Sequence, residues 1–152
     1  MSFFGHRKID NVLLIEKSLE KMICELLQQH AYIEFLVGRE GEFDQLVSST
    51  IRRCKRTIRD DNSAHIWVMP YLSAEYRKNE ETFQAYYDEI MVCEASLKAY
   101  FKNAYQTRNQ DMVNRSDLVV FCVQHESGGA WKTMQYVKKV GIPFVNLSDK
   151  NK

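Results

Sequence analysis

Residues that could bind an anion gather in a few short segments of this chain. Glycine lets the backbone approach a ligand closely, arginine can donate two parallel hydrogen bonds to a phosphate group, and a helix start offers unpaired N–H groups. The segments GHR, GREGEFD, TRNQDM and SGGA combine these features. The candidate ligand-binding residues are Gly5, His6, Arg7, Gly38, Arg39, Gly41, Asp44, Pro70, Arg108, Asn109, Ser127, Gly128 and Gly129. Their types indicate a nucleotide or another phosphorylated small molecule.

No standard motif identifies the ligand or the reaction. Neither glycine-rich segment follows GxGxxG or GxxxxGK[ST], so the dinucleotide fingerprint and the Walker A loop are both excluded. Each glycine pair, taken alone, fits a simple turn equally well. Only the glycine-containing loops taken together indicate a ligand-binding site. Catalysis would need an acid and a base within reach of one bond, and the sequence does not show that any two such groups meet. The candidate acid/base groups are His6, Asp44, Asp111 and Glu126.

The elements that position these segments follow from hydrophobic periodicity. Apolar residues three and four apart predict helices over 10–29, 41–61, 80–91, 109–116 and 128–141. Alternating or continuous apolar runs predict strands over 2–4, 31–37, 64–69, 117–123 and 142–147. The run DLVVFCV is nearly all apolar, which suits a central strand covered on both faces.

Five strands that alternate with helices predict an α/β fold. We expect a Rossmann-like three-layer sandwich, with a mainly parallel five-stranded sheet and helices on both faces. Ligands of such folds bind outside the carboxyl ends of the strands. Each candidate segment follows a predicted strand or, for TRNQDM, marks a predicted helix start. The segments should therefore meet at one edge of the sheet.

Composition bounds the class of protein. The 152 residues fit a single domain, and the net charge of +1 gives no electrostatic reason to expect nucleic-acid or membrane binding. The four cysteines form no CxxC pair, which argues against a metal site and a disulfide framework and favours a cytoplasmic location. The start MSFFGHRK has no apolar core typical of a signal peptide, and no apolar run is long enough to span a bilayer.

Five motifs in this order resemble a known family. They are FFGHR, GREGEFD, MPY, AYQTRNQDMVNRSD and SGGA. Together they resemble the YpsA-like branch of the SLOG superfamily, the Rossmann-like group that includes Lonely Guy phosphoribohydrolases and DprA-type proteins. The resemblance extends from Phe3 to Leu147 and implies a site for nucleotide-derived ligands at the carboxyl edge of the sheet.

The chain departs from the family pattern at three places. Arg39 and Glu42 stand where the second loop of the family usually has glycine, and Ala130 stands where a threonine often follows the Gly-Gly pair. The Lonely Guy signature PGGxGTxxE is also absent, since the matching segment reads SGGAWKTMQ. Phosphoribohydrolase activity is therefore not expected.

Three functions remain open at this point. The leading hypothesis is a sensor or regulatory protein that binds a nucleotide or nucleotide derivative. The alternatives are a hydrolase or transferase acting on a nucleotide ribosyl or phosphoryl bond, and a protein-interaction module with a degenerate pocket. No definite cofactor is indicated beyond that small-molecule ligand. The aromatic-rich segment 71–105 is a candidate interface for a homo-oligomer.

Overall fold

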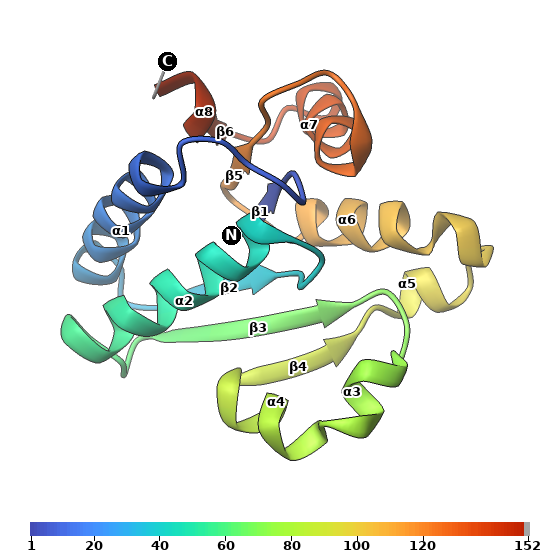
Figure 1. Cartoon of the computed structure of the whole chain (residues 1–152), viewed down its shortest axis with the longest axis horizontal. Helices are drawn as coiled ribbons and strands as arrows, with labels where there is room; N and C mark the ends of the chain where they lie inside the picture. The colour runs from blue at the N-terminus through green and yellow to red at the C-terminus, as the bar shows by residue number, and fades with distance from the viewer. Residues whose placement is uncertain (151–152) are drawn as a thin grey trace.

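The computed structural model describes residues 1–150 and shows a three-layer α/β sandwich (Figure 1). Its centre is an all-parallel sheet of six strands in the order β4-β3-β2-β1-β5-β6. The strands are β1 (Ser2–Gly5), β2 (Ile33–Val37), β3 (Ser63–Met69), β4 (Glu89–Val92), β5 (Val119–Cys122) and β6 (Phe144–Asn146). The predicted Rossmann-like sandwich is confirmed.

The strand order creates a crevice beside β1. The chain builds the sheet outward from β1 to β4, then crosses back to place β5 on the other side of β1. The loops after β1 and β5 therefore lead to helices on opposite faces of the sheet. Such a reversal point is where open α/β sheets bind their ligands.

Helices cover both faces of the sheet. One face packs against α1 (Val12–Gln29) and α2 (Glu42–Thr57), and the other packs against α6 (Ala104–Asn114) and α7 (Gly128–Val140). The remaining helical segments are short: α3 (Ala74–Lys78), α4 (Glu80–Tyr86), α5 (Glu94–Leu97), the 3-10 turn Phe101–Asn103 and α8 (Leu147–Lys150).

Periodic apolar residues explain how the long helices dock. In α1, four fully buried side chains recur every four residues, which gives one apolar stripe against the sheet. These residues are Ile15, Leu19, Ile23 and Leu27. The strands alternate in the same way, because Phe3 faces the core under α1 and α2 whereas Phe4 faces α6 and α7. The predicted helices over 10–29, 41–61 and 128–141 are confirmed, with ends shifted by up to four residues.

The sixth strand, β4, corrects the prediction of five. Residues 80–91 were predicted as one helix, but α4 ends at Tyr86 and β4 begins at Glu89. Asp88 makes this break: its amide donates to the His65 carbonyl at 2.9 Å, and its carboxylate accepts the His65 amide at 2.8 Å. These bonds start the pairing of β4 with β3. β4 is a four-residue strand at the edge of the sheet, and its residues are exposed or only partly buried.

Helix α6 also differs from the prediction. It begins at Ala104, five residues before the predicted start at residue 109. Arg108 and Asn109 were predicted at a helix start, and that prediction is wrong. They lie in the second turn of α6, where both side chains are buried.

The buried His65 makes stability depend on pH. Its Nε2 lies 2.9 Å from the Ser48 hydroxyl, and its Nδ1 is buried without a partner among residues 1–150. Burial lowers the pKa of His65 to about 4, below its unfolded value of about 6.5. The unfolded chain thus binds the extra proton first as the pH falls. We expect the free energy of unfolding to fall by about 3 kcal/mol between pH 6.5 and 4.

Urea unfolding at a series of pH values measures this dependence. The replacement His65→Phe should remove most of the slope between pH 6.5 and 4. The exposed His30 provides the matched control, so His30→Gln should retain the wild-type slope. An unchanged slope in His65→Phe would show that other groups cause the pH dependence.

Among the helices of residues 1–150, none combines the length and the apolar character that crossing a membrane demands.

Candidate functional site

A pocket of about 480 Å³ opens at the carboxyl edge of the sheet, at the reversal point beside β1. Four segments form its walls: the loop after β1, the loop after β2, the first half of α6, and the loop after β5 with the start of α7. The lining residues are Phe4, Gly5, His6, Arg7, Lys8, Glu40, Asp44, Tyr105, Gln106, Arg108, Asn109, His125, Gly128, Gly129 and Ala130. This volume suits a small-molecule ligand.

Most of the candidate residues named from the sequence line this pocket. Those that do are Gly5, His6, Arg7, Asp44, Arg108, Asn109, Gly128 and Gly129. Those outside the lining are Gly38, Arg39, Gly41, Pro70 and Ser127. Four segments far apart in the chain thus meet at one place, the carboxyl edge of the sheet.

Arg108 is the centre of a buried polar network on the β2 side of the pocket. The side chain of Arg108 is only 4% exposed. Its Nη1 donates to Glu40 Oε1 at 2.7 Å and to the Val68 carbonyl at 2.9 Å, and its Nε donates to Asn109 Oδ1 at 3.0 Å. Arg108 is therefore already paired inside the protein, and its main partner is a carboxylate rather than a ligand phosphate.

Two carboxyl groups, Glu40 and Asp44, adjoin Arg108. The Glu40 amide donates to Asp44 Oδ2 at 2.9 Å, which brings the two side chains together at the start of α2. Burial alone would raise the pKa of Glu40, but the Arg108 charge and hydrogen bonds hold it below its usual value. Burial raises the pKa of Asp44 well above its usual value, and the negative charge of Glu40 raises it further. The pKa values of the two carboxyl groups are thus shifted in opposite directions, so Asp44 keeps its proton to a higher pH than Glu40 does.

Two glycines let the loop after β2 pack closely against Glu40 and the loop after β1. A Cβ at Gly38 would collide with Glu40 Oε2, and a Cβ at Gly41 would collide with the Arg7 backbone. The Glu42 amide donates to the Arg7 carbonyl at 2.9 Å and fixes this approach. Gly38 and Gly41 therefore bring parts of the protein together, outside the ligand space.

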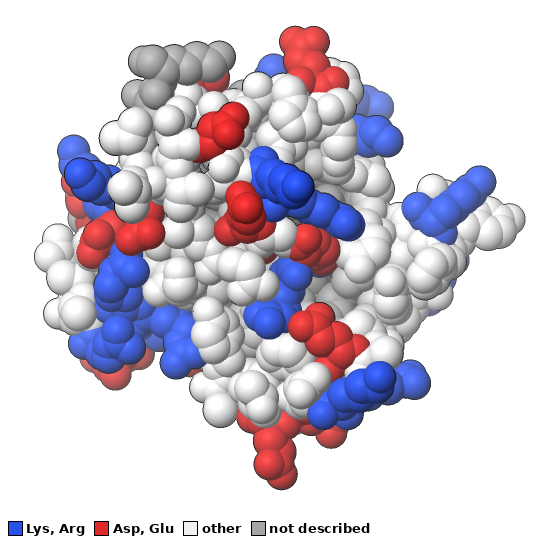
Figure 2. All heavy atoms as spheres, in the orientation of Figure 1, with Lys and Arg blue, Asp and Glu red and all other residues white. Residues whose placement is uncertain are grey.

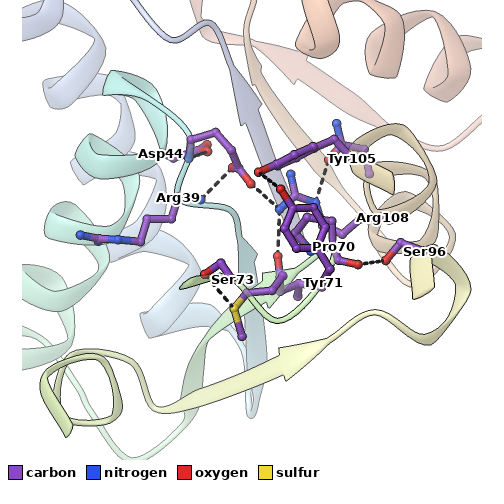
Figure 3. Close-up of polar contacts among 12 residues, drawn as sticks. Arg39, Asp44, Pro70, Tyr71, Ser73, Ser96, Tyr105 and Arg108 are labelled. Carbon is purple, nitrogen blue, oxygen red and sulfur yellow. Dashed lines mark hydrogen bonds and ion pairs between the residues drawn. The ribbon is translucent and has the colours of Figure 1, made fainter. Parts of the chain in front are cut away.

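Arg39 points out of the site. Its guanidinium lies 4.6 Å from the Phe83 ring centre and bonds to the Tyr87 hydroxyl at 3.2 Å and to Glu75 at 3.4 Å. Figure 3 shows the Arg39 side chain extending away from Arg108, while Tyr105 lies beside Arg108. The expectation that Arg39 contacts the ligand disagrees with this geometry, because an aromatic and carboxylate environment holds the cation elsewhere.

Pro70 and Ser127 have local structural roles. The Pro70 carbonyl accepts a hydrogen bond from the Ser96 hydroxyl, which ties the end of β3 to α5 (Figure 3). The Ser127 hydroxyl bonds to Nδ1 of His125 at 2.8 Å. Ser127 occupies the N-cap position of α7, yet its hydroxyl does not cap the helix. The first N–H groups of α7 are thus left for another acceptor, such as a ligand anion.

His6 and His125 form a stacked pair on the pocket wall, with ring centres 3.7 Å apart. The His125 amide donates to His6 Nε2 at 3.3 Å, which leaves Nδ1 of His6 to carry the ring proton. Burial, and then the neighbouring His125 ring, lower the pKa of His6. His6 is thus a neutral hydrogen-bond donor in the pocket rather than a cation.

The N-terminal end of α7 forms another wall of the pocket. Gly128 has a φ of 87°, a conformation that favours glycine, and it lies beside the His6 ring. The Gln106 amide donates to the Gly129 carbonyl at 3.2 Å, and Asn109 donates to the Thr133 hydroxyl at 3.1 Å. These bonds fix α7 against α6 and hold its first turn at the pocket.

Arg7 and Lys8 supply the exposed positive charge. Both side chains are exposed, and both line the pocket. Figure 2 shows basic and acidic side chains next to one another in the middle of this face, around the start of α2. The pocket therefore combines cations and helix N–H groups with a buried carboxyl pair.

Sequence reasoning missed several lining residues. Glu40 lies inside the GREGEFD motif, but the residue pattern of that motif does not indicate that the Glu40 side chain turns into the pocket. Tyr105 and His125 lie outside the four glycine- and arginine-rich segments, so they were not among the candidates. The structure places all three on the pocket wall. Within residues 1–150, no cluster of three or more metal-binding side chains occurs.

The chain matches no model of a known protein family and no curated protein.

Proposed function

We propose that this protein binds a nucleotide or nucleotide-derived phosphorylated small molecule in the pocket beside β1 and acts as a sensor or regulator. The observation that carries the proposal is the meeting of Arg7 and Lys8 with the uncapped first turn of α7 in one pocket. Helix N–H groups and flexible cations together suit a phosphate group. The exposed ring of Tyr105 offers a surface for a base.

The motif resemblance supports the same function. We infer that the chain belongs to the YpsA-like branch of the SLOG superfamily, whose ligands derive from nucleotides. The parallel sheet and a pocket at its carboxyl edge agree with that assignment. Four free cysteines, three of them buried, agree with a reducing cytoplasm.

Thermal unfolding with a nucleotide panel tests the proposal. The panel contains AMP, GMP, CMP, UMP, the corresponding diphosphates and ADP-ribose. A ligand at about 100 times its Kd should raise the Tm by about 5–10 °C. Chromatography of the same mixtures should show unchanged nucleotide. A panel that leaves the Tm unaltered would contradict the proposal.

A second candidate function is hydrolysis or transfer at a nucleotide ribosyl or phosphoryl bond. The Glu40–Asp44 pair favours it, because two adjacent carboxyl groups whose pKa values are shifted in opposite directions can act as acid and base. Release of base or phosphate in the chromatography would support this alternative over the sensor. The activity should then disappear in Asp44→Asn, which keeps the size of the side chain but cannot donate an acidic proton.

A further inference from the structure

Glu40 places an anchored carboxylate in the pocket, just beyond the carboxyl end of β2. Its side chain is 21% exposed. Glu40 Oε1 accepts from Arg108 at 2.7 Å, and Oε2 accepts from the Arg39 amide at 2.8 Å. Each carboxylate oxygen has about two lone-pair sites. The Asp44 side chain also hydrogen-bonds to this carboxylate, so three partners fix its orientation, and one carboxylate oxygen can still accept one more hydrogen bond.

The partner of that oxygen should be a donor without negative charge. A phosphate next to Glu40 would be repelled by it, whereas a hydroxyl group can donate to it. The groups that suit a phosphate, Arg7, Lys8 and the start of α7, come from other walls of the same pocket. A ligand with a phosphate group at one end and hydroxyl groups at the other could bind both the cationic groups and the Glu40 carboxylate.

The position of Glu40 resembles that of an acidic residue in dinucleotide-binding Rossmann folds. In such folds an acidic residue near the end of the second strand binds the ribose 2′-hydroxyl, and a nearby arginine accommodates a 2′-phosphate instead. Here Arg39 is next to Glu40 in sequence, but Phe83, Tyr87 and Glu75 hold its guanidinium away from the pocket. Arg108 is already paired with Glu40. The geometry thus favours an unmodified hydroxyl.

We propose that Glu40 accepts a hydrogen bond from the ribose 2′-hydroxyl of the ligand, so that the pocket selects ribonucleotides over 2′-deoxynucleotides and 2′-phosphorylated nucleotides. This inference rests on the nucleotide-binding function proposed above. It narrows the ligand class to nucleotides with a free 2′-hydroxyl and assigns the selectivity to one side chain.

Isothermal titration of the wild-type chain tests the selectivity. AMP, GMP, CMP, UMP and the corresponding diphosphates are titrated first, and the tightest of them is then compared with its 2′-deoxy and 2′-phosphate derivatives. Loss of one hydrogen bond to a charged group should weaken binding of the 2′-deoxy form about tenfold or more. The 2′-phosphate form should bind at least as weakly. Equal binding of the 2′-deoxy form, or tighter binding of the 2′-phosphate form, would overturn the inference.

The variant Glu40→Gln tests the assignment to this side chain. Glutamine retains an oxygen for Arg108 but removes the negative charge, so the preference for ribose over deoxyribose should fall toward one. The exposed Glu81 on α4 supplies the control, and Glu81→Gln should keep the wild-type preference. Should Glu40→Gln fail to fold, the wild-type comparison still decides.

The outcomes separate the two proposals. Binding of ribonucleotides without discrimination at the 2′ position would contradict only the role of Glu40. Failure of every nucleotide in the titration to bind would contradict both the role of Glu40 and the nucleotide-binding function.

Discussion

Replacing Arg108 with methionine should lower the free energy of unfolding by about 3–5 kcal/mol. The guanidinium is 4% exposed, and its loss would leave the Glu40 carboxylate without its 2.7 Å partner and the Val68 carbonyl without its donor. Removal of one member of a buried ion pair costs more than the pair itself contributes, because the remaining charge stays desolvated. Urea unfolding of the ligand-free protein measures the change.

A double variant distinguishes an unpaired charge from a packing defect. Arg108→Met combined with Glu40→Met removes both charges, so it should be more stable than Arg108→Met alone. The exposed Arg77 on α3 is the matched control, and Arg77→Ala should change stability by less than about 0.5 kcal/mol. A double variant no more stable than Arg108→Met would show that the Glu40 charge does not cause the loss.

Replacing Arg7 with alanine should affect binding and leave folding almost unchanged. The Arg7 side chain is exposed at the pocket, and only its backbone carbonyl makes a described structural bond, to the Glu42 amide. Alanine preserves that carbonyl. A charged hydrogen bond to phosphate contributes roughly 1.5–3 kcal/mol, so nucleotide affinity should fall about 10- to 100-fold.

Thermal unfolding with and without nucleotide measures both effects. The Tm of ligand-free Arg7→Ala should lie within about 2 °C of wild type, while the stabilisation by nucleotide should largely disappear. Arg77→Ala should respond to nucleotide as wild type does. A large loss of stability in the ligand-free variant would instead assign Arg7 a structural role.

The sequence predicted the core of the fold because its signals were local. Central strands such as β5 are continuous apolar runs, and helices such as α1 carry a regular apolar stripe. The parallel orientation of the strands then followed from their alternation with helices. The edge strand β4 escaped prediction because its placement depends on Asp88 bonding to β3, which is a contact between distant residues.

The candidate site was predicted in location but not in chemistry. Glycine and arginine marked the loops, yet the sequence could not show which charges would pair with each other. Arg108 binds Glu40, 68 residues away, and Arg39 turns toward Glu75 and Phe83. Only the folded arrangement shows that Arg7 and Lys8, rather than Arg39 and Arg108, supply cations to the pocket.

Nuclear magnetic resonance mapping tests directly whether a nucleotide binds in the pocket beside β1. Backbone amide signals of the ¹⁵N-labelled chain are followed during titration with the nucleotide that stabilises it most. We expect the shifts to concentrate in the four segments around the pocket, which are 5–8, 38–44, 105–109 and 125–130. Shifts concentrated around Met1, Tyr32 and Arg115, which line a separate cavity, or no shifts at all, would contradict it.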